Sequence, residues 1–354
     1  MRKPTMLVTA ASGKTGTATA LQLLARGYPV RAMVRREDDR SDRLRKAGAE
    51  ITVGSLEDLV DLRTSLAGVQ RAYFCPPLLA GTLRRATLFV AAAREARLEV
   101  IVALSQWVAD PLHPALHARE KWLSNQVLQT ATGIDVVTVA PGFFADNYMA
   151  VLEAVAQFGV MAMPLGDGLN APPSNDDIAK VVVGALADPG LHVGKSYRPT
   201  GPRLLAPDDI AGTFASVLER KVRYQNVSLT VFLKAAKALG YPDFVITQLY
   251  WFLQDYQRNA FGWGAPTQAV LEVGGSPPED FEQIVRRYVA ASALTKRTIG
   301  AKLRAALHLI QAAGTRAPEI DTTTAGDEPP TISHAVLAVD SPTWQQSHHR
   351  EPPA

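Results

Sequence analysis

Near its start the chain passes from a short apolar run, through a turn of very small residues, into a helical pattern. Met6–Thr9 is short enough for a buried parallel strand. The next four residues, Ala10–Gly13, carry almost no side chain, and Gly16 follows one helical turn later. A strand that feeds straight into a helix through such a turn is typical of parallel α/β sheets.

The turn is suited to hold a phosphate group. A helix N-terminus presents unpaired N–H groups and the positive end of the helix dipole, and both attract anions. The spacing of Ala10, Gly13 and Gly16 is that of a dinucleotide fingerprint, with Ala10 where a first glycine is expected. Lys14 can either approach a phosphate or point to water from the first helical turn.

Strand-like and helix-like segments alternate through roughly the first 200 residues. Parallel strands need crossover connections, so this alternation predicts a Rossmann-type, doubly wound parallel sheet with helices on both faces. The expected strands are Met6–Thr9, Pro29–Val34, Glu50–Val53, Arg71–Cys75, Leu98–Leu104 and Asp135–Ala140. The expected helices are Thr15–Arg26, a charged helix ending near Ala47, Leu83–Arg97 and Ala115–Thr130. Ligands bind such sheets beyond the carboxyl ends of the strands, where the phosphate turn lies.

The alternation stops after about 200 residues, which suggests a division of the chain. We expect a nucleotide-binding domain over residues 1–155, with residues 175–200 returning to the sheet, and a smaller, mostly helical C-terminal substrate lobe over 201–313. The lobe's expected helices are Pro207–Leu218, Phe281–Ala290 and a basic amphipathic one over Leu294–Ala313. Residues 314–354 lack periodicity and are expected to be a largely disordered tail with a docked piece around Val336–Trp344.

Composition excludes several classes of protein. A net charge of +3 over 354 residues is too small to imply nucleic-acid binding, and no basic helix-turn-helix pattern is present. Cys75 is the one cysteine, so a thiolate metal cluster is excluded, and His113 and His117 are separated by a helix-breaking Pro114. No apolar stretch approaches the roughly 20 residues that cross a bilayer. We therefore expect a cytoplasmic protein with no metal, no nucleic-acid partner and no membrane partner. We also expect no signal peptide, because the first predicted strand begins at Met6.

The end of the second strand bears on the choice of nucleotide. Arg35 lies 19 residues after Gly16, where an NAD-specific site places a carboxylate on the ribose 2′-hydroxyl. A guanidinium instead pairs with phosphate oxygens in a bidentate way, which favours the 2′-phosphate of NADP. We expect NADP(H) to be preferred over NAD(H). The alternative is that Arg35 and Arg36 simply end the strand in solvent.

Over approximately residues 5–290 the chain resembles the NmrA-like group of atypical short-chain dehydrogenase/reductases. The ordered set of segments is specific rather than any single motif: TAASGKTG, VRAMVRR, GAEITVGSLED, AYFCPP, LSQWVAD, HAREKWL, TVAPGFFADNY, APPSNDDIAKVVVGAL and GKSYRPTGP. The resemblance implies a Rossmann fold with a small substrate lobe that binds NADP(H). Members are reductases of quinone-like or other small carbonyl substrates, or nucleotide-sensing regulators without evident catalysis.

The resemblance also implies roles for individual residues. The pyrophosphate loop would comprise Ala10, Ser12, Gly13, Lys14, Thr15 and Gly16. Arg35 would meet the 2′-phosphate, and Ser55 with Leu56 would flank the adenine. The nicotinamide and its ribose would be bordered by Cys75, Pro76, Pro77, Ser105, Gln106, Lys121 and the segment Pro141–Phe144, including Phe143. Two residues depart from the family pattern: Ala10 replaces a glycine, and Ser55 stands where many relatives have Asp.

Catalysis is the open question at the sequence level. Typical short-chain dehydrogenases carry Tyr-x-x-x-Lys on one helix face, because residues four apart meet there. This chain has His117-x-x-x-Lys121 instead. His117 is either a proton donor, since imidazole titrates near neutral pH, or an ordinary residue at a helix start, while Lys121 is expected to hold the nicotinamide ribose. Quinones can take hydride with a proton from water, so reduction does not require the tyrosine.

An aromatic-rich stretch gives the one hint about substrate. Residues 241–263 hold eight of the chain's 25 aromatic residues. With Trp107, Phe143 and Phe144 they would line a pocket for a flat, apolar small molecule, or else build the core of the lobe or a dimer face. Two functions follow: an NADPH-dependent oxidoreductase of a small carbonyl or quinone-like substrate, or a non-catalytic NADP(H) sensor that acts on a regulatory protein partner through loops near Gly142–Asp177. The oligomeric state is not predicted.

Overall fold

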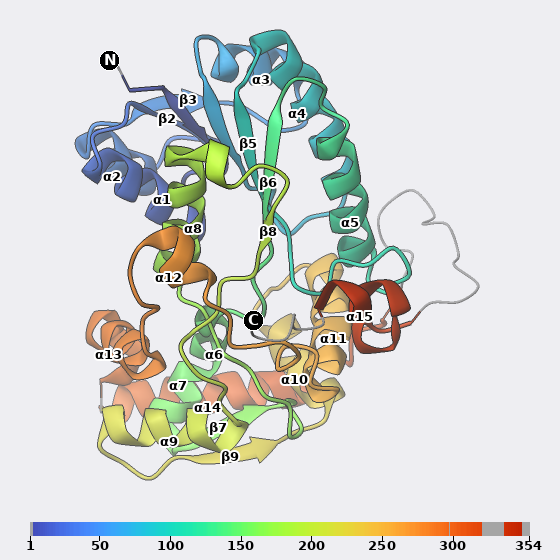
Figure 1. Cartoon of the computed structure of the whole chain (residues 1–354). Coiled ribbons are helices and arrows are strands. Elements are labelled where there is room, and N and C mark those ends of the chain that lie inside the picture. Colours follow the sequence, from blue (N-terminus) through green and yellow to red (C-terminus); the bar gives the residue numbers. More distant parts are fainter. Residues whose placement is uncertain (1–2, 297, 321–335, 349–354) are drawn as a thin grey trace.

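A seven-stranded parallel sheet forms the upper half of the computed structural model, which describes residues 3–296, 298–320 and 336–348 (Figure 1). The strand order is β3-β2-β1-β4-β5-β6-β8, and every pairing is parallel. The strands are β1 Met6–Val8, β2 Val30–Val34, β3 Glu50–Val53, β4 Arg71–Phe74, β5 Val100–Leu104, β6 Asp135–Val139 and β8 Ser196–Tyr197. The order reverses between β1 and β4, as expected for the predicted Rossmann-like fold.

Helices cover both faces of this sheet (Figure 1). One layer is formed by α1 Lys14–Ala25, α2 Asp39–Lys46 and α8 Asn175–Ala187, and the other by α3 Leu59–Leu66, α4 Thr82–Ala96 and α5 Leu116–Gln129. Side chains alternate across each strand. In β1, Met6 and Val8 pack with the first layer, whereas Leu7 packs with the second. The strands are apolar on both sides because both sides are buried.

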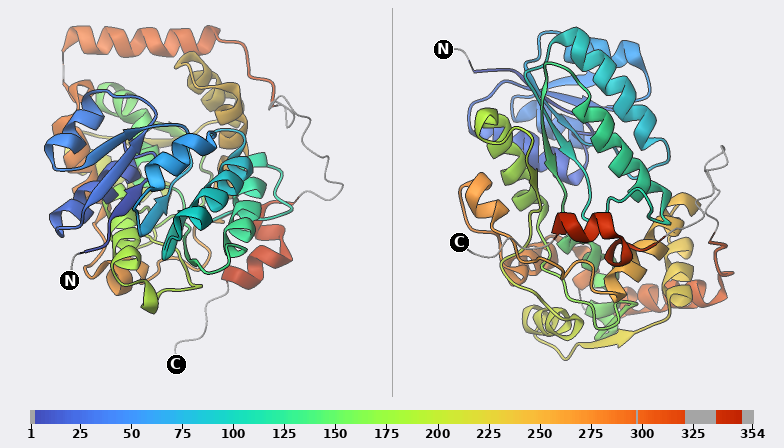
Figure 2. Two further views of the ribbon diagram at one scale, coloured as in Figure 1. Left: turned by 90° about the horizontal axis from the view of Figure 1, so that it is seen from above. Right: turned by 45° about the vertical axis from the view of Figure 1, so that its right-hand side comes forward.

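Directly after β6 the chain enters a mostly helical lobe below the sheet (Figures 1 and 2). It contains α6 Ala145–Tyr148, α7 Leu152–Phe158, α9 Pro207–Leu218, α10 Leu229–Ala238, α11 Asp243–Gln257, α13 Phe281–Ala291 and α14 Ile299–Gly314, whereas α12 Ala269–Gly274 packs back on α8. Short 3-10 turns lie at Met149–Val151, Pro189–Leu191 and Ala293–Thr295. Between these elements, β7 Val160–Met163 pairs in parallel with β9 Arg223–Asn226. The lobe is therefore assembled from two parts of the chain, with α8 and β8 returning to the sheet between them.

The last helix of the lobe begins later than the pattern predicted. We expected it to start at Leu294, whereas α14 starts at Ile299. The Thr298 hydroxyl accepts a hydrogen bond from Ala301 N, and this cap fixes the first turn. Residues 293–295 form a separate 3-10 turn before it.

Part of the predicted tail packs against the body of the protein. Residues 336–348 contain a 3-10 turn, Ala338–Asp340, and helix α15, Pro342–His348. Trp344 is 1% exposed, and its indole Nε1 donates to Trp107 O over 2.7 Å. This is the docked piece expected there; residues 321–335 and 349–354 of the predicted tail lie outside the described residues. Within the described ranges, no helix has both the length and the apolar character of a membrane span.

Candidate functional site

The phosphate turn, Ala10–Gly16, joins β1 to α1 at the point where the strand order reverses. Ala10 has a φ of 46°, a left-handed conformation that favours glycine. Gly13 N donates to Ala10 O over 2.8 Å and closes the turn. A Cβ added to Gly16 would lie 2.4 Å from Ala10 O, so only glycine allows α1 to start this close to the turn.

The N-terminus of α1 is left available for an anion. Its N-cap, Gly13, makes no side-chain capping bond, and the first turn contains no acidic residue. In contrast, α2, α3 and α8 are capped by the side chains of Asp38, Asp58 and Ser174. An uncapped helix end next to a tight glycine turn fits the pyrophosphate of a dinucleotide.

Lys14 forms an ion pair that the sequence did not suggest. Its Nζ lies 2.5 Å from Asp146 Oδ2 of α6, and the hydroxyl of Tyr288 from α13 donates to the other oxygen of Asp146. Lys14 thus connects the first turn of α1 with the helical lobe. Its side chain is 67% exposed, so the pair contributes little to stability.

Arginines gather at the carboxyl end of β2. Arg35 is the first residue after the strand, and both Arg35 and Arg36 are exposed. Sequence reasoning missed Arg40, whose Nη1 reaches Ser12 O of the phosphate turn over 3.5 Å. The same guanidinium hydrogen-bonds to Asp38 and lowers the pKa of that carboxyl to about 2. The signal for Arg40 was its place in the first turn of the charged helix that follows the strand.

Ser55 and Leu56 follow β3 at the same edge of the sheet. Ser55 N donates to Asp61 Oδ2 over 2.9 Å, and Ser55 Oγ accepts from Glu57 N over 3.1 Å. Leu56 is half-buried and packs against the α3 and α4 layer. The loop that was expected to flank the adenine is therefore held by its own hydrogen bonds.

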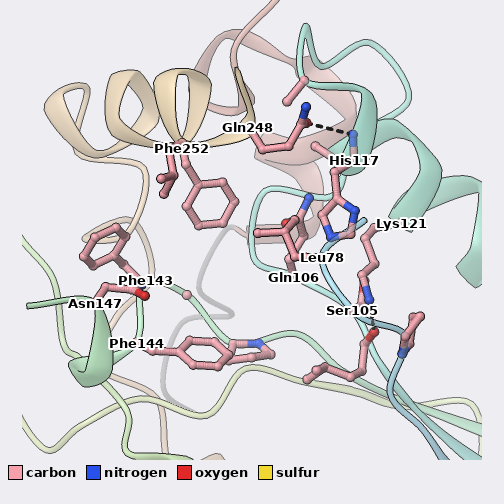
Figure 3. A pocket seen from close by; sticks show the side chains of 17 residues that line it. Leu78, Ser105, Gln106, His117, Lys121, Phe143, Phe144, Asn147, Gln248 and Phe252 are labelled. Atoms are coloured by element: carbon pink, nitrogen blue, oxygen red, sulfur yellow. Dashed lines mark hydrogen bonds between the residues drawn. The ribbon is translucent and has the colours of Figure 1, made fainter. Parts of the chain in front are cut away.

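A cavity of about 260 Å³ lies beyond the carboxyl ends of β4, β5 and β6 (Figure 3). Several of the residues expected at the nicotinamide end line it, namely Pro76, Ser105, Gln106, Lys121, Pro141, Phe143 and Phe144, together with His117. Pro77 is exposed and does not line the cavity. Cys75 is buried beneath it, with Sγ 3.6 Å from Thr15 Oγ1.

His117 and Lys121 lie one helical turn apart on the same wall of the cavity (Figure 3). Burial, and then the nearby charges of Lys121 and Arg85, hold the pKa of His117 well below its usual range. Burial also lowers the pKa of Lys121 from 10.5 to about 8, and its Nζ donates to Leu104 O over 2.6 Å. The imidazole is therefore neutral at physiological pH, whereas the lysine loses its proton at a pH close to the physiological range.

The cavity also contains residues that the sequence did not point to: Leu78, Asn147, Gln248 and Leu249. Gln248 Oε1 accepts a hydrogen bond from His117 N over 3.0 Å and joins α11 to the start of α5. Gln106 Nε2 is buried without a hydrogen-bond partner among the described residues. A bound ligand with an acceptor oxygen would satisfy it. Asn147 and Gln248 had no sequence signal of their own, because single Gln and Asn residues carry no pattern.

The rings of the aromatic stretch divide between the cavity, the lobe core and more exposed positions. Among the eight aromatics of residues 241–263, Phe252 is in the cavity lining. Tyr256 and Phe261 are fully buried with Phe143 in the lobe core. Trp107, also expected in the pocket, is 1% exposed and donates its indole N–H to Ala260 O instead. Of the two interpretations, the pocket holds for Phe252 and the core for Tyr256 and Phe261, whereas Tyr241 and Trp263 are exposed.

The other buried histidine of this region is already paired. His113 Nε2 lies 2.7 Å from Asp255 Oδ2, and His113 Nδ1 accepts from Ala115 N. Neither side chain is exposed, so the pair fixes the loop that leads into α5. In the part of the chain that the structure describes, no group of His, Cys, Asp and Glu is arranged to hold a metal ion.

Comparison with known proteins agrees with this geometry. An NAD(P)H azoreductase of Xenophilus azovorans is 28% identical over 293 residues, which cover 81% of this chain and 98% of that protein. The NADPH complex of a quinone oxidoreductase from Escherichia coli has the same fold, with a TM-score of 0.69, 23% identity and coverage of 80% of this chain and 99% of that one. The negative transcriptional regulator NmrA in complex with NADP also shares the fold, with a TM-score of 0.68, 16% identity and coverage of 84% and 100%. The model of the NmrA-like family matches residues 2–262, and the chain therefore belongs to the NmrA-like family.

Proposed function

We propose that this protein is an NADP(H)-dependent oxidoreductase that transfers hydride to a small, flat, apolar carbonyl or quinone-like acceptor. The observation that supports this most is the position of the cavity. It opens at the same sheet edge as the phosphate turn, with Pro76, Ser105 and Pro141 between the turn and the lobe. A dinucleotide whose pyrophosphate lies at Gly13 would extend its nicotinamide towards these residues.

The lining of the cavity favours an apolar acceptor. Leu78, Phe143, Phe144 and Phe252 surround it, and the polar groups are few. A cavity of about 260 Å³ suits a molecule with one or two rings. Reductases among the relatives support this class: one is named an azoreductase and another a quinone oxidoreductase. The amide of Gln106 is placed to donate to an acceptor oxygen.

When bound, NADPH supplies the hydride, and reduction of a carbonyl also needs a proton, from a residue of this chain or, for a quinone, from water. We propose Lys121 as the donor, because its ammonium loses a proton near pH 8 and it lies in the cavity wall. The hydrogen bond to Gln248 comes from the backbone N–H of His117, so it joins α5 to α11 without using the imidazole. The proposal differs from the sequence expectation, in which His117 was the candidate proton donor and Lys121 held the nicotinamide ribose.

The proposed preference for NADP(H) over NAD(H) rests on the arginines after β2. Arg35 is exposed at the strand end, and Arg40 reaches the phosphate turn. Both guanidinium groups can pair with a 2′-phosphate, which NAD lacks. The two carboxylates that follow, Glu37 and Asp38, are already paired with Arg45 and Arg40, so neither is free to accept from a ribose hydroxyl.

The test is an acceptor screen with both nucleotides. We expect NADPH to bind more tightly than NADH, and NADPH to be oxidised faster in the presence of quinones, azo compounds or enones than in protein-free controls. If every acceptor gives only the background rate while NADPH still binds, the protein is not a reductase of this class.

A second candidate function is an NADP(H) sensor without turnover. It is supported by the His117 replacement of the usual tyrosine and by the ion pair of Lys14 with Asp146, which links the phosphate turn to the lobe. A bound pyrophosphate would compete for Lys14 and could release the lobe. Nucleotide-dependent capture of a protein partner, with no turnover of any acceptor, would favour this alternative.

A further inference from the structure

The basic residues of this chain are unevenly distributed. Residues 220–242 and 283–318 together hold 12 of the 37 lysines and arginines and none of the 34 aspartates and glutamates. The overall charge of +3 hides this, because the rest of the chain is net negative. The two segments form β9, α10, most of α13 and α14, at the end of the molecule remote from α3 (Figure 1).

Helix α14 combines this charge with an exposed apolar stripe. Ile299, Leu303, Leu307 and Ile310 are spaced four, four and three residues apart, so they share one side of the helix. Their exposed fractions are 83%, 62%, 64% and 68%. The opposite side packs on the lobe through Ala301 and Ala305, which are buried. Figure 2 shows α14 along the outer edge of the molecule.

Acidic neighbours do not cancel the charge around this stripe. Glu153 of α7 is the carboxylate packed against α14, and it is already paired with Arg304 and His308. Glu319, which follows the helix, pairs with Arg316. Five exposed cations have no carboxylate partner among the described residues: Lys221, Arg223, Lys237, Lys296 and Lys302. Lys302 directly precedes Leu303 of the stripe.

We propose that α14, with the basic residues around it, docks this protein on an anionic phospholipid surface. The aliphatic side chains would enter the interface, and the cations would meet lipid phosphates. A nucleic acid would use the cations but offers nothing to four exposed aliphatic side chains. A second copy would cover the stripe but would bring like charges together. A lipid surface offers both an apolar interior for the aliphatic side chains and phosphates for the cations.

This proposal does not depend on hydride transfer, and it replaces the expectation of no membrane partner. That expectation came from the lack of an apolar stretch long enough to cross a bilayer, which says nothing about a shorter amphipathic helix lying on a membrane surface. α10 packs between α14 and α11, whose Phe252 lines the cavity. An apolar acceptor dissolved in the lipid would thus lie close to the lobe that holds the cavity.

Sedimentation with lipid vesicles tests the proposal on the full-length protein. We expect binding to vesicles of mixed phosphatidylglycerol and phosphatidylcholine, and little binding to phosphatidylcholine alone. The double variant Leu307→Gln/Ile310→Gln should weaken binding by about tenfold or more, because two exposed apolar groups are lost. Lys302→Gln should weaken it by about fivefold, the contribution of one cation near an anionic surface.

The matched control removes two exposed apolar side chains elsewhere. Leu191 and Val193, near β8, are 63% and 43% exposed, and Leu191→Gln/Val193→Gln should bind like the unmodified protein. Equal loss in both double variants, or no binding to anionic vesicles, would overturn the proposal. So would a dimer that only the α14 variant disrupts, or DNA binding that survives that variant, since these assign the surface to a second copy or to nucleic acid. Thermal unfolding checks that each variant is folded.

Discussion

The phosphate turn and the cavity both lie at the carboxyl ends of the strands but are built from different parts of the chain. The turn is seven consecutive residues, Ala10–Gly16, and its shape depends on backbone geometry. The cavity gathers side chains from segments between Pro76 and Phe252. A site made of backbone is fixed by local sequence, whereas one made of distant side chains depends on how the lobe packs. Variants in the turn should therefore change NADPH affinity, whereas variants in the cavity should change turnover or the KM for the acceptor.

The largest expected effect is at Gly16. In Gly16→Ala the added methyl would lie 2.4 Å from Ala10 O, so the turn must shift away from the helix end. We expect NADPH affinity to fall by about a hundredfold, since several charge-assisted hydrogen bonds are lost together. Calorimetric titration measures it.

Two further glycines calibrate that result. Gly13→Ala should have a smaller effect, because its added Cβ would be 3.1 Å from the same oxygen. Gly212→Ala, in α9, meets no atom within 4 Å and should leave binding unchanged. If all three variants bind NADPH alike, the turn does not hold the cofactor.

Next in size is the effect of removing Lys121. Its ammonium is protonated below its pKa of about 8, so reduction of a carbonyl should slow as the pH rises through 8. Lys121→Met should lose this pH dependence and be about a hundredfold slower at pH 7, the usual contribution of a general acid. His117→Ala should lower turnover without abolishing it and should keep the pH dependence. If the loss of turnover above pH 8 disappears in His117→Ala but persists in Lys121→Met, His117 rather than Lys121 is the proton donor.

The third prediction concerns the nucleotide. Arg35→Ser should weaken NADPH binding by about 10- to 100-fold, the value of one or two bonds to a phosphate, and leave NADH binding nearly unchanged. Arg94→Ser, at an exposed position on α4, serves as the control. Equal losses for both nucleotides would mean that Arg35 does not contact the 2′-phosphate.

The smallest effect is expected at the lobe side of the cavity. Phe252→Leu removes ring area from the lining and should raise the KM for aromatic acceptors about fivefold, with NADPH affinity unchanged. Tyr250→Leu, on the same helix but outside the lining, is the matched control. Similar KM values in the two variants would place the acceptor elsewhere.

This difference between the regions also explains how far the sequence could be interpreted. The alternating pattern predicted each long strand of the sheet to within two residues at either end, because buried parallel strands are apolar and local turns limit them. The phosphate turn could also be recognised in the sequence, because it is formed by consecutive residues. In the cavity, His117, Lys121 and Ser105 were placed by the family resemblance, but Gln248 and Asn147 were not, since nothing local marks them. The two interpretations of the aromatic stretch stayed open because core and pocket rings share one composition, and only packing separates Phe252 from Tyr256.

Transfer of hydride from bound NADPH to an acceptor in the cavity is tested most directly in a single turnover. Protein holding one equivalent of NADPH is mixed rapidly with a benzoquinone, and the nicotinamide absorbance is followed. We predict that the rate constant of the decay saturates with quinone concentration and falls when deuterium replaces the transferred hydrogen. In Phe252→Leu the rate constant at a given quinone concentration should be lower. A decay no faster than that of free NADPH, from protein shown to hold the nucleotide, would contradict the account and favour the sensor.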